Sequence, residues 1–191
     1  MGHLIAGADV MVQSWRAGSL KGRGFGAEEA AAIRPGIIYV SVSCFGDRGP
    51  WATRGGFEQL GQAASGIAIT EGYPDKPRLV PSGLLNDYLT GYLGAMGAML
   101  AMLRRAEEGG SYHVKVALAR TSMWVQSLGL CEPEAAMRGR KFGDDLHPLL
   151  ESRESAFGLL EQLPPVAQFS RTNARWTLPP APTGAHEMRW R

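Results

Sequence analysis

The stretch Val80–Gly110, VPSGLLNDYLTGYLGAMGAMLAMLRRAEEGG, has the strongest helical pattern and decides how the rest of the chain is arranged. Large apolar side chains recur in it at spacings of three and four residues, from Leu85 to Leu103. Pro81-Ser82 suits the start of a helix and Gly109-Gly110 suits its end. Because the other positions are mostly Gly and Ala, the pattern predicts a helix that is buried on nearly every side and closely approached by other backbone.

Asp87 is the only charged residue in the first part of this stretch, and the run from Tyr88 to Leu103 contains no charge. The dipole of a helix favours an ionised carboxylate near the helix N-terminus. One interpretation is that Asp87 only caps the helix. The other is that a partly desolvated carboxylate at this position acts as a nucleophile on a carbonyl carbon. The pattern alone leaves both open.

The composition is that of an ordinary globular protein. The chain has 191 residues, enough for one domain or slightly more, and a net charge of +2 without a dense block of Lys and Arg. Cys44 and Cys131 lack the spacing of metal ligands, which indicates reduced thiols and a cytoplasmic setting. No signal sequence is recognisable, and the uncharged run is shorter than the roughly 20 residues of a membrane span, so we expect neither secretion nor a membrane.

The segments around the central helix alternate between strand and helix patterns. The strand patterns cover residues 10–12, 37–43 and 111–118, and the helix patterns cover residues 27–33, 57–68 and 119–129. Residues 37–43, IIYVSVS, resemble a buried parallel strand, and the Gly-rich loop that follows is a typical place for binding groups. This alternation predicts an α/β fold with an open sheet and flanking helices.

The two ends of the chain have no such pattern. The Gly-rich, basic loop at 13–26 contains neither of the common phosphate-binding glycine motifs. Residues 130–162 are charged and weakly periodic, which suits a linker or a reduced small domain after a core at 1–129. Residues 163–191 hold five prolines and two tryptophans. They predict an extended Pro-rich arm that packs on another surface through its aromatic residues, and a disordered end is the alternative.

Five segments in series resemble the class III CoA-transferases. They are ADVMVQSWRAGSLKGRGFG at 8–26, RPGIIYVSVSCFGDRGPW at 34–51, GGFEQLGQAASGI at 55–67, LLNDYLTGYLGAMGAMLAMLRR at 84–105 and GGSYHVKVALARTSMW at 109–124. Each segment alone is a weak signal, whereas five in this order and at compatible spacing are specific. The resemblance implies a partial Rossmann-like sheet, a chain that opens well past the first strands of the family, and a CoA-transferase activity.

The resemblance also implies the role of Asp87. In the family, the aspartate at this place attacks the thioester of an acyl-CoA and forms an acyl–aspartyl anhydride. The CoA thiolate then gives an aspartyl-CoA thioester, from which an acceptor acid takes the CoA. A carboxylate is a weak nucleophile, so it depends on positioning and reduced solvation. CoA and acyl-CoA are then substrates together with a small carboxylic acid, and we expect no metal and no permanently bound cofactor.

The resemblance implies two loops that contact CoA. The expected contacts are Ser14, Trp15, Arg16, Lys21, Arg23, Gly55, Gly56, Phe57 and Glu58. Ser14 stands where the family usually has Asn, and Lys21 or Arg23 replaces a basic residue that falls on Gly22 here. The racemases of the family have a proton-shuttling histidine at the place of Phe57. Since a phenyl ring cannot exchange a proton, Phe57 favours CoA transfer over racemisation.

Two readings of the whole chain remain at this point. The family forms interlocked homodimers, which implies a homodimer here or completion of the sheet by a partner chain. The alternative to an active transferase is an inactive remnant, or an interaction subunit, that has lost the N-terminal part of the family fold.

Overall fold

The computed structural model describes residues 1–131 and 144–190, and these form two compact units. Of the described residues, the first unit contains 1–130 together with Trp190, and the second contains Cys131 and 144–189. Part of the predicted linker region, residues 132–143, lies outside the described residues.

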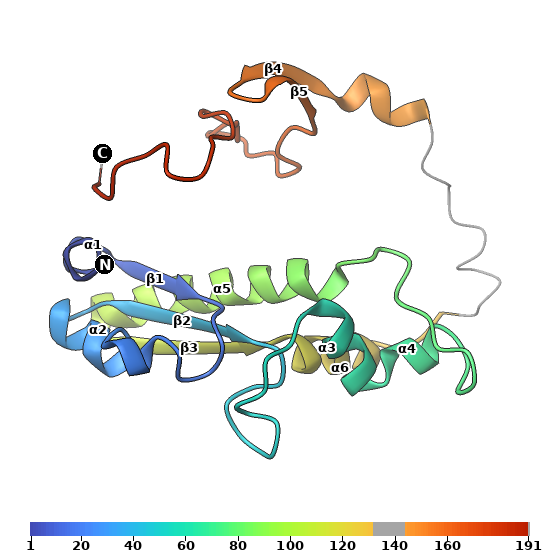
Figure 1. Ribbon diagram of the computed structural model, residues 1–191, viewed down its shortest axis with the longest axis horizontal. Helices are drawn as coiled ribbons and strands as arrows, with labels where there is room; N and C mark the ends of the chain where they lie inside the picture. The colour runs from blue at the N-terminus through green and yellow to red at the C-terminus, as the bar shows by residue number, and fades with distance from the viewer. Residues whose placement is uncertain (132–143, 191) are drawn as a thin grey trace. The chain divides into compact units, whose positions relative to one another are not determined.

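The first unit is built on a parallel sheet in the order β1-β2-β3, as Figure 1 shows. Its strands are β1 Val10–Gln13, β2 Ile38–Ser43 and β3 Tyr112–Ala117. Val12 is in register with Val40, and Val40 is in register with Val114. The prediction of an α/β fold with an open, partial sheet is therefore confirmed, and each expected strand lies within two residues of its predicted bounds.

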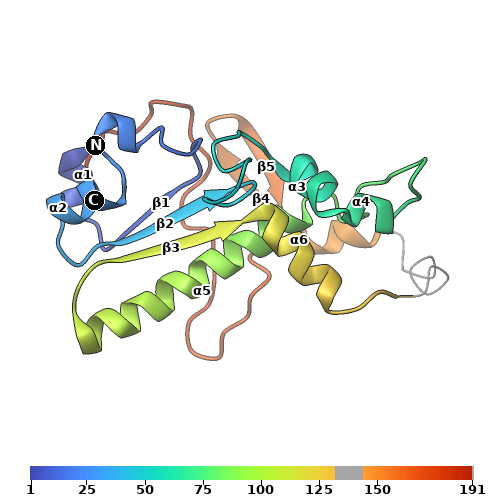
Figure 2. The same ribbon diagram turned by 90° about the horizontal axis from the view of Figure 1, so that it is seen from below.

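Helices cover the two faces of this sheet, and helical segments also lie beyond its ends (Figures 1 and 2). Their bounds are α1 Gly2–Ala6, η1 Lys21–Arg23, α2 Ala27–Ile33, α3 Glu58–Ser65, α4 Ile67–Thr70, α5 Leu85–Glu108 and α6 Leu118–Ser127. The single helix predicted over 57–68 is broken at Gly66, whose φ of +82° lies in the left-handed region that favours glycine. The chain therefore turns there and continues as the short helix α4.

The two faces of the sheet belong to different clusters of the core. On one face, Ile38 and Val40 pack against Ala98 and Ala101 of α5. On the other face, Tyr39 packs with Ala30 of α2 and with Ile5 of α1. Since side chains alternate along a strand, successive residues of β2 enter opposite clusters, and β2 is buried from both sides over its first half.

The prediction that α5 is buried on nearly every side is wrong. Its small residues face the sheet as expected: a Cβ on Gly97 would lie 2.7 Å from Cγ1 of Val114. Its large apolar residues lie on the opposite side, and Tyr88, Tyr92 and Leu103 are 64, 71 and 64% exposed. The helix therefore has two different faces: small residues pack against β2 and β3, and large apolar residues form an open face on the other side. The apolar repeat in the sequence does not distinguish the two. We call this open face, with Tyr88, Tyr92, Met96, Met99 and Leu103, the α5 stripe.

The second unit contains a hairpin that the weak periodicity of the sequence does not predict. The elements are η2 Asp144–Leu149, β4 Glu151–Ser155 and β5 Gly158–Gln162, with β4 and β5 antiparallel. Residues 163–190 contain no helix or strand. They still make specific contacts: Nε1 of Trp176 donates to the carbonyl of Leu163 at 3.0 Å, and Nη2 of Arg153 donates to the carbonyl of Trp176 at 3.0 Å. Within the described residues, no helix has the length and apolar character needed to cross a membrane.

Candidate active site

The first turns of α3 and α5 meet through the carboxylate of Glu58. Its Oε2 accepts a hydrogen bond from the backbone N–H of Asp87 at 2.7 Å, and its Oε1 accepts one from the N–H of Asn86 at 3.1 Å. These N–H groups belong to the first turn of α5, where backbone donors have no partner within the helix. Glu58 is only 2% exposed, so a buried negative charge from another element caps the helix on which Asp87 lies.

Gln62 holds this carboxylate in place from one turn along α3. Its Nε2 donates to Oε1 of Glu58 at 2.6 Å and to the carbonyl of Gly83 at 3.0 Å, and its Oε1 accepts from the N–H of Val80 at 2.9 Å. Gln62 is fully buried. The side chains of Glu58 and Gln62 thus connect α3 to the loop that precedes α5 and to the start of α5 itself.

Asp87 projects from this junction as an exposed side chain. Partial burial, and then the negative charge of Glu58, raise the pKa of Asp87 above the usual value of an aspartate. This direction is opposite to the one expected from the helix dipole alone, because desolvation and a like charge both penalise the ionised form. A higher pKa makes the carboxylate a better nucleophile once it is ionised.

Cys44 lies beside the same acidic pair. Its thiol donates to the carbonyl of Phe57 at 3.7 Å, and its side chain is buried. Burial and the charges of Glu58 and Asp87 raise the pKa of the Cys44 thiol, so it remains a neutral thiol rather than a reactive thiolate. The structure therefore places Cys44 as a packing partner at the site.

The two predicted CoA loops come together at a cavity of about 280 Å³ next to Cys44. Of the residues expected to contact CoA, the cavity is lined by Ser14, Trp15, Arg16, Gly55, Gly56 and Phe57. A Cβ on Gly56 would lie 2.5 Å from Cβ and Sγ of Cys44, which explains why glycine is needed at this position.

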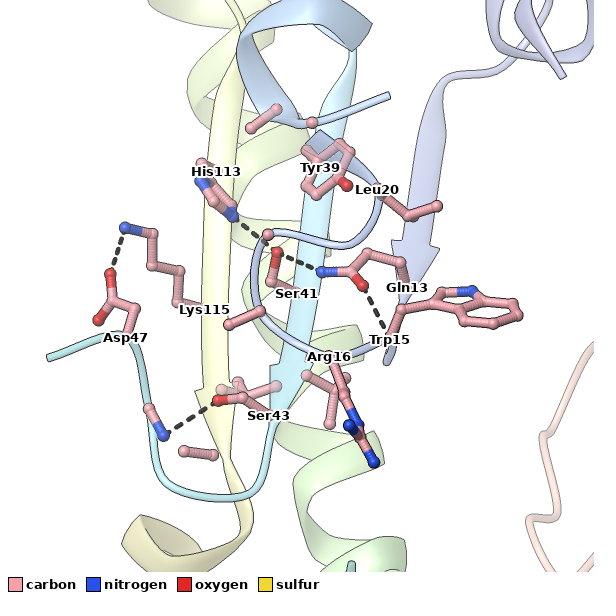
Figure 3. Close-up of a pocket in the computed structure, with 18 of the residues that line it drawn as sticks. Gln13, Trp15, Arg16, Leu20, Tyr39, Ser41, Ser43, Asp47, His113 and Lys115 are labelled. Carbon is pink, nitrogen blue, oxygen red and sulfur yellow. Dashed lines mark hydrogen bonds and ion pairs between the residues drawn. The ribbon is translucent and has the colours of Figure 1, made fainter. Parts of the chain in front are cut away.

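The remaining predicted contacts lie elsewhere. Lys21 lines a second, larger cavity of about 750 Å³ that also includes Trp15 and Arg16, part of which is drawn in Figure 3. Arg23 lies in neither cavity, and its Nη1 donates to Oγ of Ser19 at 2.6 Å. Glu58 lines neither cavity, because its carboxylate is turned into the capping interaction described above.

Sequence reasoning missed the capping pair of Glu58 and Gln62. The signal that could have found it is a Glu and a Gln at spacing i, i+4 in the helix of residues 58–65, ahead of a helix with Asn86-Asp87 in its first turn. Among the described residues, no group of three or more His, Cys, Asp or Glu side chains is arranged to hold a metal ion.

Comparison with known proteins gives relatives of one kind. An acetyl-coenzyme A transferase (nodX) of Hypoxylon pulicicidum is 39% identical over 134 residues, which cover 66% of this chain and 22% of the relative. A succinyl-CoA–D-citramalate CoA-transferase of Chloroflexus aurantiacus is 33% identical over 116 residues, which cover 61% of this chain and 29% of that protein. The chain thus spans about a quarter of the length of these relatives.

Solved structures agree with the sequence relatives. A CaiB/BaiF family protein from Brucella suis matches with a TM-score of 0.61 and 27% identity, over 83% of this chain and 44% of that one. Rv3272 from Mycobacterium tuberculosis matches with a TM-score of 0.61 and 26% identity, over 72% and 37% of the two chains. The model of CoA-transferase family III matches residues 1–154, most of the chain. The chain therefore belongs to CoA-transferase family III.

Proposed function

We propose that this chain takes part in the transfer of CoA from an acyl-CoA to a carboxylic acid, with Asp87 as the nucleophile. The observation that supports this most directly is the position of Asp87. Its carboxylate is exposed at the start of α5, while its backbone N–H is fixed by the buried Glu58 at 2.7 Å. An exposed acid on a rigid backbone can meet a substrate in one orientation, which is what a weak nucleophile requires.

The proposed reaction needs no other reagent than the two substrates. An oxygen of the ionised Asp87 attacks the thioester carbonyl, the C–S bond breaks, and CoA leaves as a thiolate. The thiolate then attacks the Asp87 carbonyl of the resulting anhydride and releases the first carboxylate. The acceptor carboxylate repeats these steps in reverse order and restores Asp87, so charge and atoms balance.

The 280 Å³ cavity beside Cys44 is the proposed passage for the thiol arm of CoA. Gly55 and Gly56 allow a close approach to backbone, and the exposed Phe57 and Trp15 offer apolar contacts. We assign Lys21 and Arg23 to the phosphates of CoA, because both are cations on the exposed loop that also contributes Ser14 to Arg16. Glu58 has the separate role of positioning Asp87.

We further propose that the α5 stripe is covered in the functional assembly, either by a second copy in a homodimer or by a partner chain. Tyr92 and Leu103 are 71 and 64% exposed, and a continuous apolar helix face of this kind marks an interaction surface. Relatives named as alpha and beta subunits of a succinyl-CoA–L-malate CoA-transferase support an assembly of more than one chain. The free thiols of Cys44 and Cys131 suit a cytoplasmic setting.

Replacing the nucleophile tests the proposal. After incubation with an acyl-CoA, intact-mass and peptide mass spectrometry should find acyl or CoA adducts on Asp87, and Asp87→Asn should abolish both the adducts and turnover. The loss should be about a thousandfold or more, because the covalent step disappears. Asp75→Asn, at an exposed turn, is the matched control and should retain full activity. Adducts of unchanged yield in Asp87→Asn would contradict the assignment.

Titration calorimetry with CoA separates an active chain from an interaction subunit. Micromolar binding would support a CoA site formed by the two loops in this chain. If a cooperatively folded chain binds no CoA, the alternative of a subunit that contributes Asp87 to a site completed by another polypeptide would be favoured.

Incubation in D₂O should give no exchange of the α-proton of the acyl group, because Phe57 cannot shuttle protons.

A further inference from the structure

The face of the sheet opposite α5 has an unexpected row of polar side chains. Gln13, Ser41 and His113 lie on β1, β2 and β3, and Figure 3 shows their side chains gathered on this face. The strands of a parallel sheet are normally apolar on both faces, as the face toward α5 is here with Val40 and Val114. Where polar side chains on a sheet face lose contact with water, the desolvation is unfavourable unless they find polar partners.

The members of this row are hydrogen-bonded to one another. Nε2 of Gln13 donates to Oγ of Ser41 at 3.0 Å, and Oγ of Ser41 lies 2.8 Å from Nε2 of His113. The ring of Tyr39 stands edge-on to the imidazole, with 5.3 Å between the ring centroids. Burial, and then the charge of Lys115, lower the pKa of His113 and keep it neutral near pH 7. The row is therefore an ordered, uncharged surface that can both donate and accept hydrogen bonds.

A cavity of about 750 Å³ lies over this row, within the size range of sites for small molecules. Aromatic side chains form part of its walls: Trp15, Phe45 and Trp124 line it along with Tyr39. The exposed fraction of Trp15 is 64%, so a large apolar surface at the wall is open to a ligand. A polar floor and aromatic walls suit a flat ring with a hydrogen-bonding substituent.

Charged side chains at the cavity fall into paired and unpaired groups. Lys115 is paired with Asp47 at 2.6 Å, and Lys21 is paired with Glu28 at 3.4 Å. Arg16 and Arg120 also line the cavity, and the side chain of neither makes an ion pair or a hydrogen bond within the described part of the chain. Two guanidinium groups without a carboxylate partner favour an anionic group of a ligand, and arginine suits a carboxylate particularly well.

We propose that the cavity over β1–β3 is a binding site for a small aromatic carboxylate that also has a hydroxyl group. The carboxylate is held by Arg16 and Arg120, the ring lies against the aromatic walls, and the hydroxyl joins the Ser41–His113 hydrogen bond. Oε2 of Glu29, which is buried at this cavity without a hydrogen-bond partner, is a second acceptor for such a hydroxyl. Asp87 lines no part of the cavity, whereas Trp15, Arg16 and Lys21, three of the expected CoA contacts, do line it, so this site adjoins the proposed CoA site without containing the proposed nucleophile.

The probe is 4-hydroxyphenylacetate, with two matched molecules that each lack one feature. Phenylacetate lacks the hydroxyl, and 4-hydroxyphenethyl alcohol lacks the carboxylate. Titration followed by NMR of the full chain should show saturable binding of the probe with shifts in the His113 imidazole signals. Each matched molecule should bind about tenfold more weakly, the effect of one lost hydrogen bond or ion pair in a partly buried site.

Variants locate the contact on the protein. Ser41→Ala and His113→Gln should each weaken binding of the probe about tenfold, with little effect on the weaker binding of phenylacetate. Ser152→Ala and His3→Gln replace exposed residues outside the cavity and should bind the probe normally. Circular dichroism and thermal melts check that Ser41→Ala and His113→Gln are folded, and the NMR signals of His113 in the unmodified chain test the contact without any substitution.

The outcomes separate this site from the proposed transfer. Binding of the probe to Asp87→Asn at full affinity, with loss in Ser41→Ala, is the expected result. Absence of saturable binding to the unmodified chain at millimolar probe would overturn the proposal, and so would equal binding by the unmodified chain, Ser41→Ala and His113→Gln. Neither result would bear on the CoA adducts of Asp87, which depend on a different residue and reagent.

Discussion

At the scale of single residues, Glu58 both stabilises the start of α5 and influences the ionisation of Asp87. Both of its oxygens accept hydrogen bonds from the start of α5, and it is 2% exposed. In Glu58→Gln the amide group presents a donor where an acceptor is needed, so one backbone N–H loses its partner. We expect a loss of about 1–3 kcal/mol in the free energy of unfolding, measured by urea denaturation. Glu107→Gln, on the exposed end of α5, should stay within about 0.5 kcal/mol of the parent.

The same substitution should move a pH profile. Burial and the charge of Glu58 raise the pKa of Asp87, so the ionised form of this proposed nucleophile accumulates only as the pH rises through that raised value. Removing the Glu58 charge in Glu58→Gln lowers the pKa of Asp87, and the acidic limb of the rate of Asp87 adduct formation should shift to lower pH. The free energy of unfolding changes in the opposite direction to the rate, because the folded chain holds the Asp87 proton more tightly than the unfolded chain does. Ionisation of Asp87 therefore destabilises the fold as the pH rises from the unfolded-state pKa through the raised folded-state pKa. An acidic limb at the same pH in both proteins would show that Glu58 acts only through its hydrogen bonds.

At the scale of elements, the close packing of α5 against the sheet depends on Gly97. A Cβ on Gly97 would lie 2.7 Å from Cγ1 of Val114, whereas a Cβ on Gly91 would meet nothing within 4 Å. Gly97→Leu should therefore push α5 away from β3 and cost more than about 2 kcal/mol, since overpacking outweighs the gain in helix propensity. Gly91→Leu should stabilise the chain by about 0.5–1 kcal/mol. Thermal melts of the two variants test the packing, and melts that shift together would contradict it.

The elements were largely predictable, but their surroundings were not. The strand over residues 37–43 and the end of the central helix at Gly109 follow from local residue types, and both are confirmed. The burial of α5 was overestimated because a helical repeat of apolar residues does not say which of them face a neighbour. The capping role of Glu58 and the row formed by Gln13, Ser41 and His113 were missed for a related reason. Both depend on the register of segments far apart in the sequence, which a single sequence does not encode locally.

At the scale of the whole molecule, the α5 stripe is the surface through which we propose that the chain associates. If a second copy covers it, sedimentation velocity should detect dimers at micromolar concentration, and the double variant Tyr92→Lys with Met99→Lys should be monomeric, because charges at a buried apolar contact are strongly unfavourable. Tyr73→Lys replaces an aromatic residue of comparable exposure away from α5, so it is the control and should leave the dimer intact. Equal sedimentation of all three proteins would rule out the α5 stripe as the dimer contact.

The parallel register of the sheet also dictates when this protein can fold during its synthesis. Val40 pairs with Val114, and all of α3, α4 and α5 are made between them. While the ribosome is still adding these helices, the second edge of β2 and the small-residue face of α5 have no β3 to meet, so both remain open to wrong partners. We therefore expect a nascent chain stopped before Tyr112 to be protease-sensitive and to recruit chaperones, and one long enough for Ser127 to have left the ribosome to acquire protection in a single cooperative step.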